Sequence, residues 1–140
     1  MSELAGTVVD TDVFSSLYIR KPTGDVRIPG WREALADRRV LIAFQTRAEV
    51  LAGVRSAGWG KQRVAQVLGV LDRTPTIHSD AEVVEAYAIL TAECRRSGHA
   101  LHDRPHTGDR WIAACAIAKQ FDLLAGDTIY QGAPNLAIRN

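Results

Sequence analysis

The chain has 140 residues, the size of one compact domain, which is enough to bury roughly 70% of the surface of the unfolded chain. Hydrophobic residues make up 46% and charged residues 24%, which excludes disordered and collagen-like proteins. A net charge of +1 does not indicate a strongly basic nucleic-acid-binding domain. Fourteen of the seventeen basic residues are nevertheless arginines, whose planar guanidinium suits contact with phosphate.

The N-terminal residues and the two cysteines indicate the compartment. Glu3 stands where a secretion signal would carry positive charge, and no apolar stretch approaches the roughly 20 residues of a membrane span. We therefore expect a cytoplasmic protein that does not contact the membrane. Cys94 and Cys115 are isolated and lack CxxC spacing, so we expect reduced thiols that serve as packing residues.

Strands alternate with helices along the whole chain. Hydrophobic periodicity, with Gly and Pro as element ends, predicts a strand over residues 6–10, helices over 13–18 and 31–38, and a strand over 40–44. Helices over 46–56 and 62–71, a strand over 75–78 and a helix from Ser79 through 96 follow. After a polar loop over 99–107 come a helix over 109–121, a strand over 123–125 and an edge strand over 135–138. This alternation predicts a three-layer α/β/α sandwich with a mostly parallel central sheet.

Two acids stand directly after predicted strands. Asp10 ends the first strand, and Asp127 follows the strand over residues 123–125. Ligands of parallel α/β sheets bind at the carboxyl ends of the strands, so these two acids mark the expected binding edge. An acid that ends a buried strand is costly to desolvate unless it is paired or metal-bound, which favours a functional role for Asp10.

Four segments carry a resemblance to PIN-domain nucleases. Val8-Val9-Asp10-Thr11-Asp12-Val13 resembles the opening of that family, and three further segments match its order: Thr46-Arg47-Ala48-Glu49-Val50-Leu51-Ala52-Gly53, Gly108-Asp109-Arg110-Trp111-Ile112-Ala113-Ala114 and Leu123-Leu124-Ala125-Gly126-Asp127. The resemblance spans the chain and implies a single PIN domain over residues 1–140. One departure is Ala125, where the family often carries Ser or Thr.

The resemblance implies a VapC-type toxin of a type II toxin–antitoxin system. Such a protein is an endoribonuclease held inactive by a cognate VapB-like antitoxin, and it implies an RNA substrate and a homodimer or toxin–antitoxin hetero-oligomer. The implied catalytic and metal-binding residues are Asp10, Glu49, Asp109 and Asp127. All four offer the hard carboxylate oxygens that Mg²⁺ and Mn²⁺ prefer. We expect Asp10 and Asp127 to bind metal directly, and Glu49 to hold a water or act as general base.

Residues beside these acids are given supporting roles. Thr11 is expected to hydrogen-bond Asp10 or Asp127, and Asp12 either supports the metal site or caps the first helix. Arg104 and Arg110 flank Asp109 and are candidates for contact with RNA phosphates.

Three of the four acids also have a local structural alternative. Glu49 stands three residues after Thr46, as in a capping box, Asp109 lies in a first helical turn, and Asp127 follows Gly126 as turn residues do. A zinc site is a further alternative, built on three histidines and an aspartate of the polar loop: His99, His102, His106 and Asp103.

Two other classes of protein remain open. The Asp10-Thr11-Asp12 segment also resembles the motif of haloacid-dehalogenase-type phosphatases, with Asp10 as nucleophile and Asp12 as acid, although Lys61 is poorly placed for that family. A non-catalytic PIN-like interaction module would keep the acids and bind only a partner. In VapC-like toxins the antitoxin covers a groove of the early helices, here residues 13–20, 31–38 and 46–58, with Trp31 and Trp59 as candidate anchors or core residues.

Overall fold

A parallel sheet forms the centre of the fold in the computed structural model, which describes residues 4–140. Its strands lie in the order β3-β2-β1-β4: β1 (Gly6–Val9), β2 (Arg39–Ala43), β3 (Thr76–Ile77) and β4 (Asp122–Leu124). Val8 of β1 pairs with Leu41 on one side and Leu123 on the other. β1 is covered on both faces, so its consecutive residues Thr7, Val8 and Val9 are all buried.

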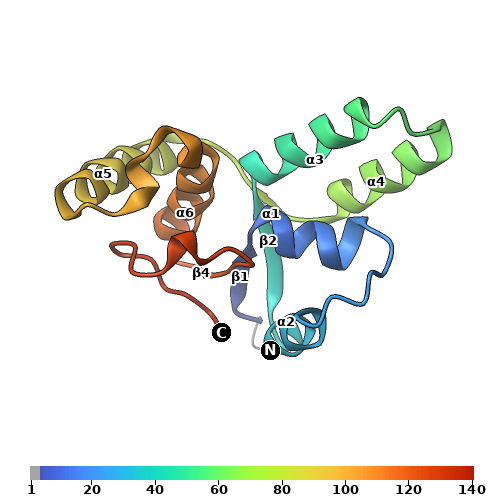
Figure 1. Ribbon diagram of the computed structural model, residues 1–140, viewed down its shortest axis with the longest axis horizontal. Coiled ribbons are helices and arrows are strands. Elements are labelled where there is room, and N and C mark those ends of the chain that lie inside the picture. The colour runs from blue at the N-terminus through green and yellow to red at the C-terminus, as the bar shows by residue number, and fades with distance from the viewer. Residues whose placement is uncertain (1–3) are drawn as a thin grey trace.

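Helices cover both faces of this sheet (Figure 1). α5 (Ala81–Ser97) and α6 (Thr107–Lys119) lie on one side, and α1 (Thr11–Phe14), α3 (Phe44–Ser56) and α4 (Lys61–Arg73) lie on the other. Val8 packs into the hydrophobic core between the sheet and α5 and α6. Its neighbour Val9 points to the opposite face and packs into the core formed with α3, α4 and α2 (Ile28–Leu35). The predicted three-layer α/β/α sandwich is therefore confirmed.

Several predicted boundaries move by a few residues. α2 begins at Ile28 because Pro29 fits the first turn, where its missing N–H needs no partner. α5 is capped by Asp80, whose Oδ1 accepts a hydrogen bond from the Val83 N–H at 3.0 Å, so the predicted Ser79 cap is wrong. The edge strand predicted over residues 135–138 is also wrong, because in the described chain that segment contributes only a single bridge between Ile138 and Leu123.

The first helix widens after one turn. α1 runs directly into a π-helical turn, η1 (Ser15–Ile19), whose end is marked by the Arg20 N–H donating to the Ser15 carbonyl at 2.8 Å. A π-turn holds one residue more than an α-turn and is frequent at functional sites. It buries Ile19 in the core and brings the exposed Arg20 to the same edge of the sheet as Asp10.

The two cysteines serve as packing residues, as predicted. Cys94 and Cys115 are buried and free, and burial raises the pKa of the Cys115 thiol to about 12, which keeps it protonated. No helix within residues 4–140 has the length and apolar character that a membrane span requires.

Candidate active site

An open cavity of about 560 Å³ lies where β1 and β4 end. Its lining includes the four acids singled out in the sequence: Asp10, Glu49, Asp109 and Asp127. Asp10 follows β1, Asp127 follows β4, and the other two come from α3 and α6. The fold therefore gathers into one cavity four carboxylates that lie far apart in the sequence.

Asp10 is the most buried of these acids, at 4% exposure. Its Oδ1 accepts a hydrogen bond from the Val13 N–H at 2.9 Å and its Oδ2 accepts one from the Gly126 N–H at 3.0 Å. Asp10 also caps α1, so the alternative of Asp12 as the cap is wrong. Burial raises the pKa of the Asp10 carboxyl from 3.8 to about 6, even though the two backbone hydrogen bonds act to lower it.

Two side chains hold Asp109 in place. The buried Tyr130 hydroxyl donates to Asp109 Oδ1 at 3.2 Å, and His106 Nδ1 lies 2.9 Å from Asp109 Oδ2. Burial, followed by the neighbouring charge of Asp109, raises the pKa of Tyr130, so its hydroxyl stays a neutral donor. Tyr130 was not predicted from the sequence, although its position three residues after Asp127, in the same turn, indicates this edge of the sheet.

Thr11 and Thr46 fix the orientation of Glu49. The Thr11 hydroxyl donates to Glu49 Oε2 at 2.5 Å and lies 3.0 Å from the Thr46 hydroxyl. The expected contact of Thr11 with Asp10 or Asp127 is therefore wrong. The capping box of Thr46 and Glu49 is also wrong, because α3 begins earlier, at Phe44, and has no side-chain cap.

Asp127 and Gly126 close the cavity on the side of β4. Asp127 is exposed and caps the turn Thr128–Tyr130, with its Oδ1 accepting from the Ile129 N–H at 2.9 Å. A Cβ at Gly126 would collide with Asp12 Oδ2, so any side chain there would require the Asp12 carboxylate to move. Asp12 itself pairs with Arg27 at 3.3 Å and so supports the wall of the cavity.

The two arginines beside Asp109 lie in different environments. Arg104 is exposed, but Arg110 is only 6% exposed and its guanidinium donates to the carbonyls of Leu101, at 2.5 Å, and Asp103, at 3.0 Å. Because these donors are engaged inside the protein, the assignment of Arg110 to RNA contact is wrong. Arg110 organises the loop before α6 instead.

The histidines of that loop do not gather. His99 contacts the Gln131 carbonyl at 2.8 Å, His102 lies 3.3 Å from Asp103, and His106 lies beside Asp109. Within residues 4–140, no three His, Cys, Asp or Glu side chains stand close enough to enclose a metal ion on their own. The zinc alternative is therefore wrong for the described chain.

Comparison with known proteins identifies the family. The sequence pattern of the PIN domain matches residues 7–135, which is most of the chain. The chain belongs to the PIN-domain family. Among curated proteins, none matches this PIN domain by sequence.

Solved structures share the PIN fold over nearly the full chain. VapBC-5 from Mycobacterium tuberculosis is 28% identical, with a TM-score of 0.65 over 99% of this chain and 100% of that one. VapBC2 from Rickettsia felis, bound to a promoter DNA fragment, is 23% identical, with a TM-score of 0.74 over 96% and 97%. FitAcB from Neisseria gonorrhoeae is 22% identical, with a TM-score of 0.72 over 96% of both chains.

The donors of this PIN domain suit a hydrated divalent cation. Mg²⁺ keeps several of its waters and needs only one or two carboxylates, so a fully enclosing cluster is not required. Asp10 is buried without a cationic partner within the described chain, and a nearby cation would relieve the cost of its charge. Thr128 lines the cavity as a hydroxyl, whereas Ala125 packs against the core.

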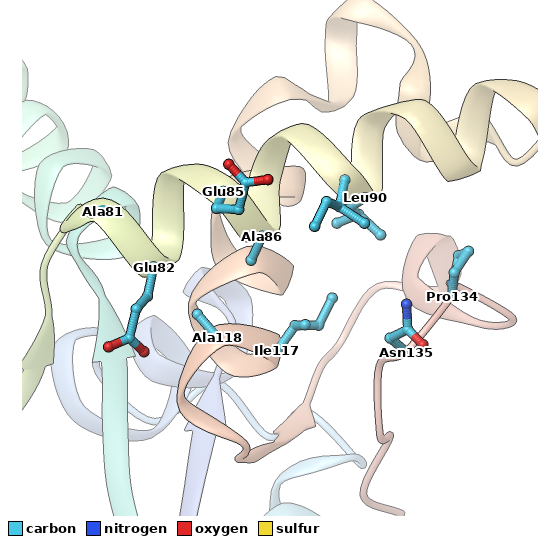
Figure 2. A pocket seen from close by; sticks show the side chains of 10 residues that line it. Ala81, Glu82, Glu85, Ala86, Leu90, Ile117, Ala118, Pro134 and Asn135 are labelled. Atoms are coloured by element: carbon cyan, nitrogen blue, oxygen red, sulfur yellow. The ribbon is translucent and has the colours of Figure 1, made fainter.

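A second cavity, of about 540 Å³, lies between α5, α6 and the C-terminal segment (Figure 2). Leu90, Ile117 and Pro134 line it, so its wall is mainly apolar, and the acids at its edge are Glu82 and Glu85. It contains none of the acids that the PIN-domain resemblance singles out. We therefore place the candidate active site in the acidic cavity at the ends of β1 and β4.

Proposed function

We propose that this protein is a Mg²⁺- or Mn²⁺-dependent endoribonuclease that acts as a toxin and is neutralised by a cognate antitoxin. The observation that carries the proposal is the gathering of Asp10, Glu49, Asp109 and Asp127 into one cavity of a PIN domain. Four acids from separate elements give this cavity a negative charge that a bound cation would balance.

The residues divide the chemistry between them. Asp10 and Asp127 would bind the metal directly, and Asp109 would bind it directly or through a water. The bound metal would lower the pKa of a water and stabilise charge on the cleaved phosphate. Glu49, exposed and oriented by Thr11, is positioned to accept the proton of the attacking water. Tyr130 and His106 keep Asp109 directed toward the cavity.

An antitoxin partner is proposed from the relatives. The solved structures with a similar fold include VapBC-5, a member of the VapBC family of toxin–antitoxin systems, and VapBC2. Trp31 is not an exposed anchor for such a partner, because it is only 8% exposed and packs in the core with Leu35. Trp59, at 40% exposure, remains accessible.

The alternative phosphatase assignment is not retained. The PIN-domain match over residues 7–135 replaces that assignment, and Asp12, its proposed acid, pairs with Arg27 at 3.3 Å. The non-catalytic module differs from the nuclease in one measurable property, which is RNA cleavage that depends on divalent metal.

Substitution of the acids tests the proposal. Asp10→Asn, Glu49→Gln, Asp109→Asn and Asp127→Asn are each expected to abolish RNA cleavage in Mg²⁺. The protein is expected to stay folded, because each substitution keeps the size of the side chain and removes a negative charge from the acidic cavity. Thermal melts in chelator provide the control for folding. Full cleavage by these variants, or by the wild type in excess EDTA, would contradict the proposal.

A further inference from the structure

A groove leads away from the acidic cavity toward Trp59. A hollow of about 320 Å³ shares Thr11, Arg20 and Glu49 with the acidic cavity, and it extends over an apolar floor to Trp59. A second hollow, of about 480 Å³, shares Arg20 and Trp59 with the first. We call these two hollows together the Trp59 groove. It is continuous with the site at which we propose RNA to be cut.

The outer part of the Trp59 groove is positively charged. Arg20, Lys21 and Arg63 line it, and none of the three pairs with a carboxylate within residues 4–140. The acidic cavity and the basic groove therefore stand side by side, with Arg20 lining both. An anionic chain that enters the acidic cavity would meet its cationic contacts in this groove.

The ring of Trp59 is held in place at the groove wall. Trp59 lies in the turn between α3 and α4, after Gly58, whose φ of +65° suits glycine. The Arg63 guanidinium stands 5.0 Å from the centroid of the ring and also donates to the Ile19 carbonyl. The arginine therefore fixes the indole while 40% of the Trp59 surface stays exposed.

We propose that the Trp59 groove binds a single-stranded segment of RNA next to the cleaved phosphate, with a base stacked on Trp59 and phosphates on Arg20 and Lys21. This inference rests on the proposed nuclease function and names the form of its substrate. Basic grooves with an aromatic platform bind single-stranded nucleic acid in this way, because every base has a face that stacks. A duplex keeps its bases stacked internally and cannot use the platform.

Binding in chelator separates this inference from catalysis. The wild type and its variants are titrated with a short fluorescein-labelled single-stranded RNA of mixed sequence, and with the same strand annealed to its complement. The expected order is tighter binding of the single strand. Trp59→Leu should weaken it roughly 5- to 100-fold, whereas Trp59→Phe, which can still stack, should retain most of the affinity. Indole fluorescence should be quenched in the wild type and not in Trp59→Phe.

Arginine variants test the phosphate contacts. Arg20→Ala should reduce the slope of log affinity against log salt by about 0.7, the effect of one lost phosphate contact on a single strand. Arg95→Ala removes the same charge from the end of α5 and should leave the slope unchanged.

Three results would overturn the inference: equal binding by wild type and Trp59→Leu, equal weakening by Leu and Phe, or a preference for duplex. A variant Trp59→Leu that still binds RNA but no longer co-elutes with the candidate antitoxin encoded by an adjacent short gene would show that the groove binds a protein partner instead. Cleavage assays in Mg²⁺ judge the nuclease proposal separately, because a chain that cuts RNA independently of Asp109 would refute that proposal while the Trp59 result stood.

Discussion

The burial of Asp10 predicts a stability profile that is opposite to that of most acids. A carboxyl whose pKa is raised on folding, here from 3.8 to about 6, binds its proton more tightly in the folded than in the unfolded state. Its contribution to stability is therefore full below about pH 4, falls as the pH rises, and is lost by about pH 7. Asp10→Asn cannot titrate and should remove this dependence.

The shift of about 2 pKa units corresponds to about 3 kcal/mol, since one unit is about 1.4 kcal/mol. Between about pH 4 and pH 8, the wild type in chelator should lose about 2 to 3 kcal/mol of unfolding free energy relative to Asp10→Asn. Urea unfolding followed by circular dichroism measures this difference. Other titrating groups are common to both proteins and cancel in the comparison.

Asp72→Asn serves as the matched control, because it makes the same chemical change on a side chain that is 70% exposed. Its profile should stay within about 0.5 kcal/mol of the wild type at each pH. Parallel profiles for the wild type and Asp10→Asn would refute the reasoning, since they would show that Asp10 ionises equally in the folded and unfolded states.

Three further predictions concern the metal and the residues around the site. Activity lost in EDTA should return with Mg²⁺ or Mn²⁺ but not with Zn²⁺, because the proposed donors are carboxylates and water; restoration by Zn²⁺ alone would contradict this. Tyr130→Phe should cost about 1 kcal/mol of stability and lower kcat more than it changes KM, since only the hydrogen bond to Asp109 is removed; unchanged single-turnover kinetics would argue against a positioning role. Arg110→Ala should lower the free energy of unfolding by about 3 kcal/mol, because it leaves the buried carbonyls of Leu101 and Asp103 without a hydrogen-bond donor. Arg104→Ala should change the free energy of unfolding by less than about 0.5 kcal/mol, since Arg104 is exposed. Equal melting temperatures of the two variants would contradict the difference.

The layers of the fold could be predicted from periodicity, but some element ends could not. The apolar run at residues 40–44 has no alternation, which indicates a strand covered on both faces, and β2 confirms it within one residue. The segment over residues 135–138 has a similar apolar content. It forms a single bridge because strand formation depends on a partner edge, which local sequence does not encode.

The positions of the four acids were predicted from the resemblance, whereas their contacts were not. Thr11 reaches Glu49 because α3 begins at Phe44, directly after β2, which turns Glu49 toward Thr11. Arg110 looks like a surface residue in sequence because charged side chains usually are exposed. Arg110 is buried because the loop before α6 folds over it and places the carbonyls of Leu101 and Asp103 beside its guanidinium. The spacing of residues in the sequence does not predict this contact.

Arg20 directly follows the π-helical turn at Ser15–Ile19, so the direction of its side chain depends on the number of residues in that turn. Each residue of an α-helix rotates the chain by about 100°, so deleting one residue from this turn would restore regular winding and swing the following side chains through about that angle. Arg20 would leave the mouth of the cavity while Asp10 kept its place. If the proposed RNA contact of Arg20 holds, a change of length at this single turn would alter RNA binding without any change in the four acids of the cavity.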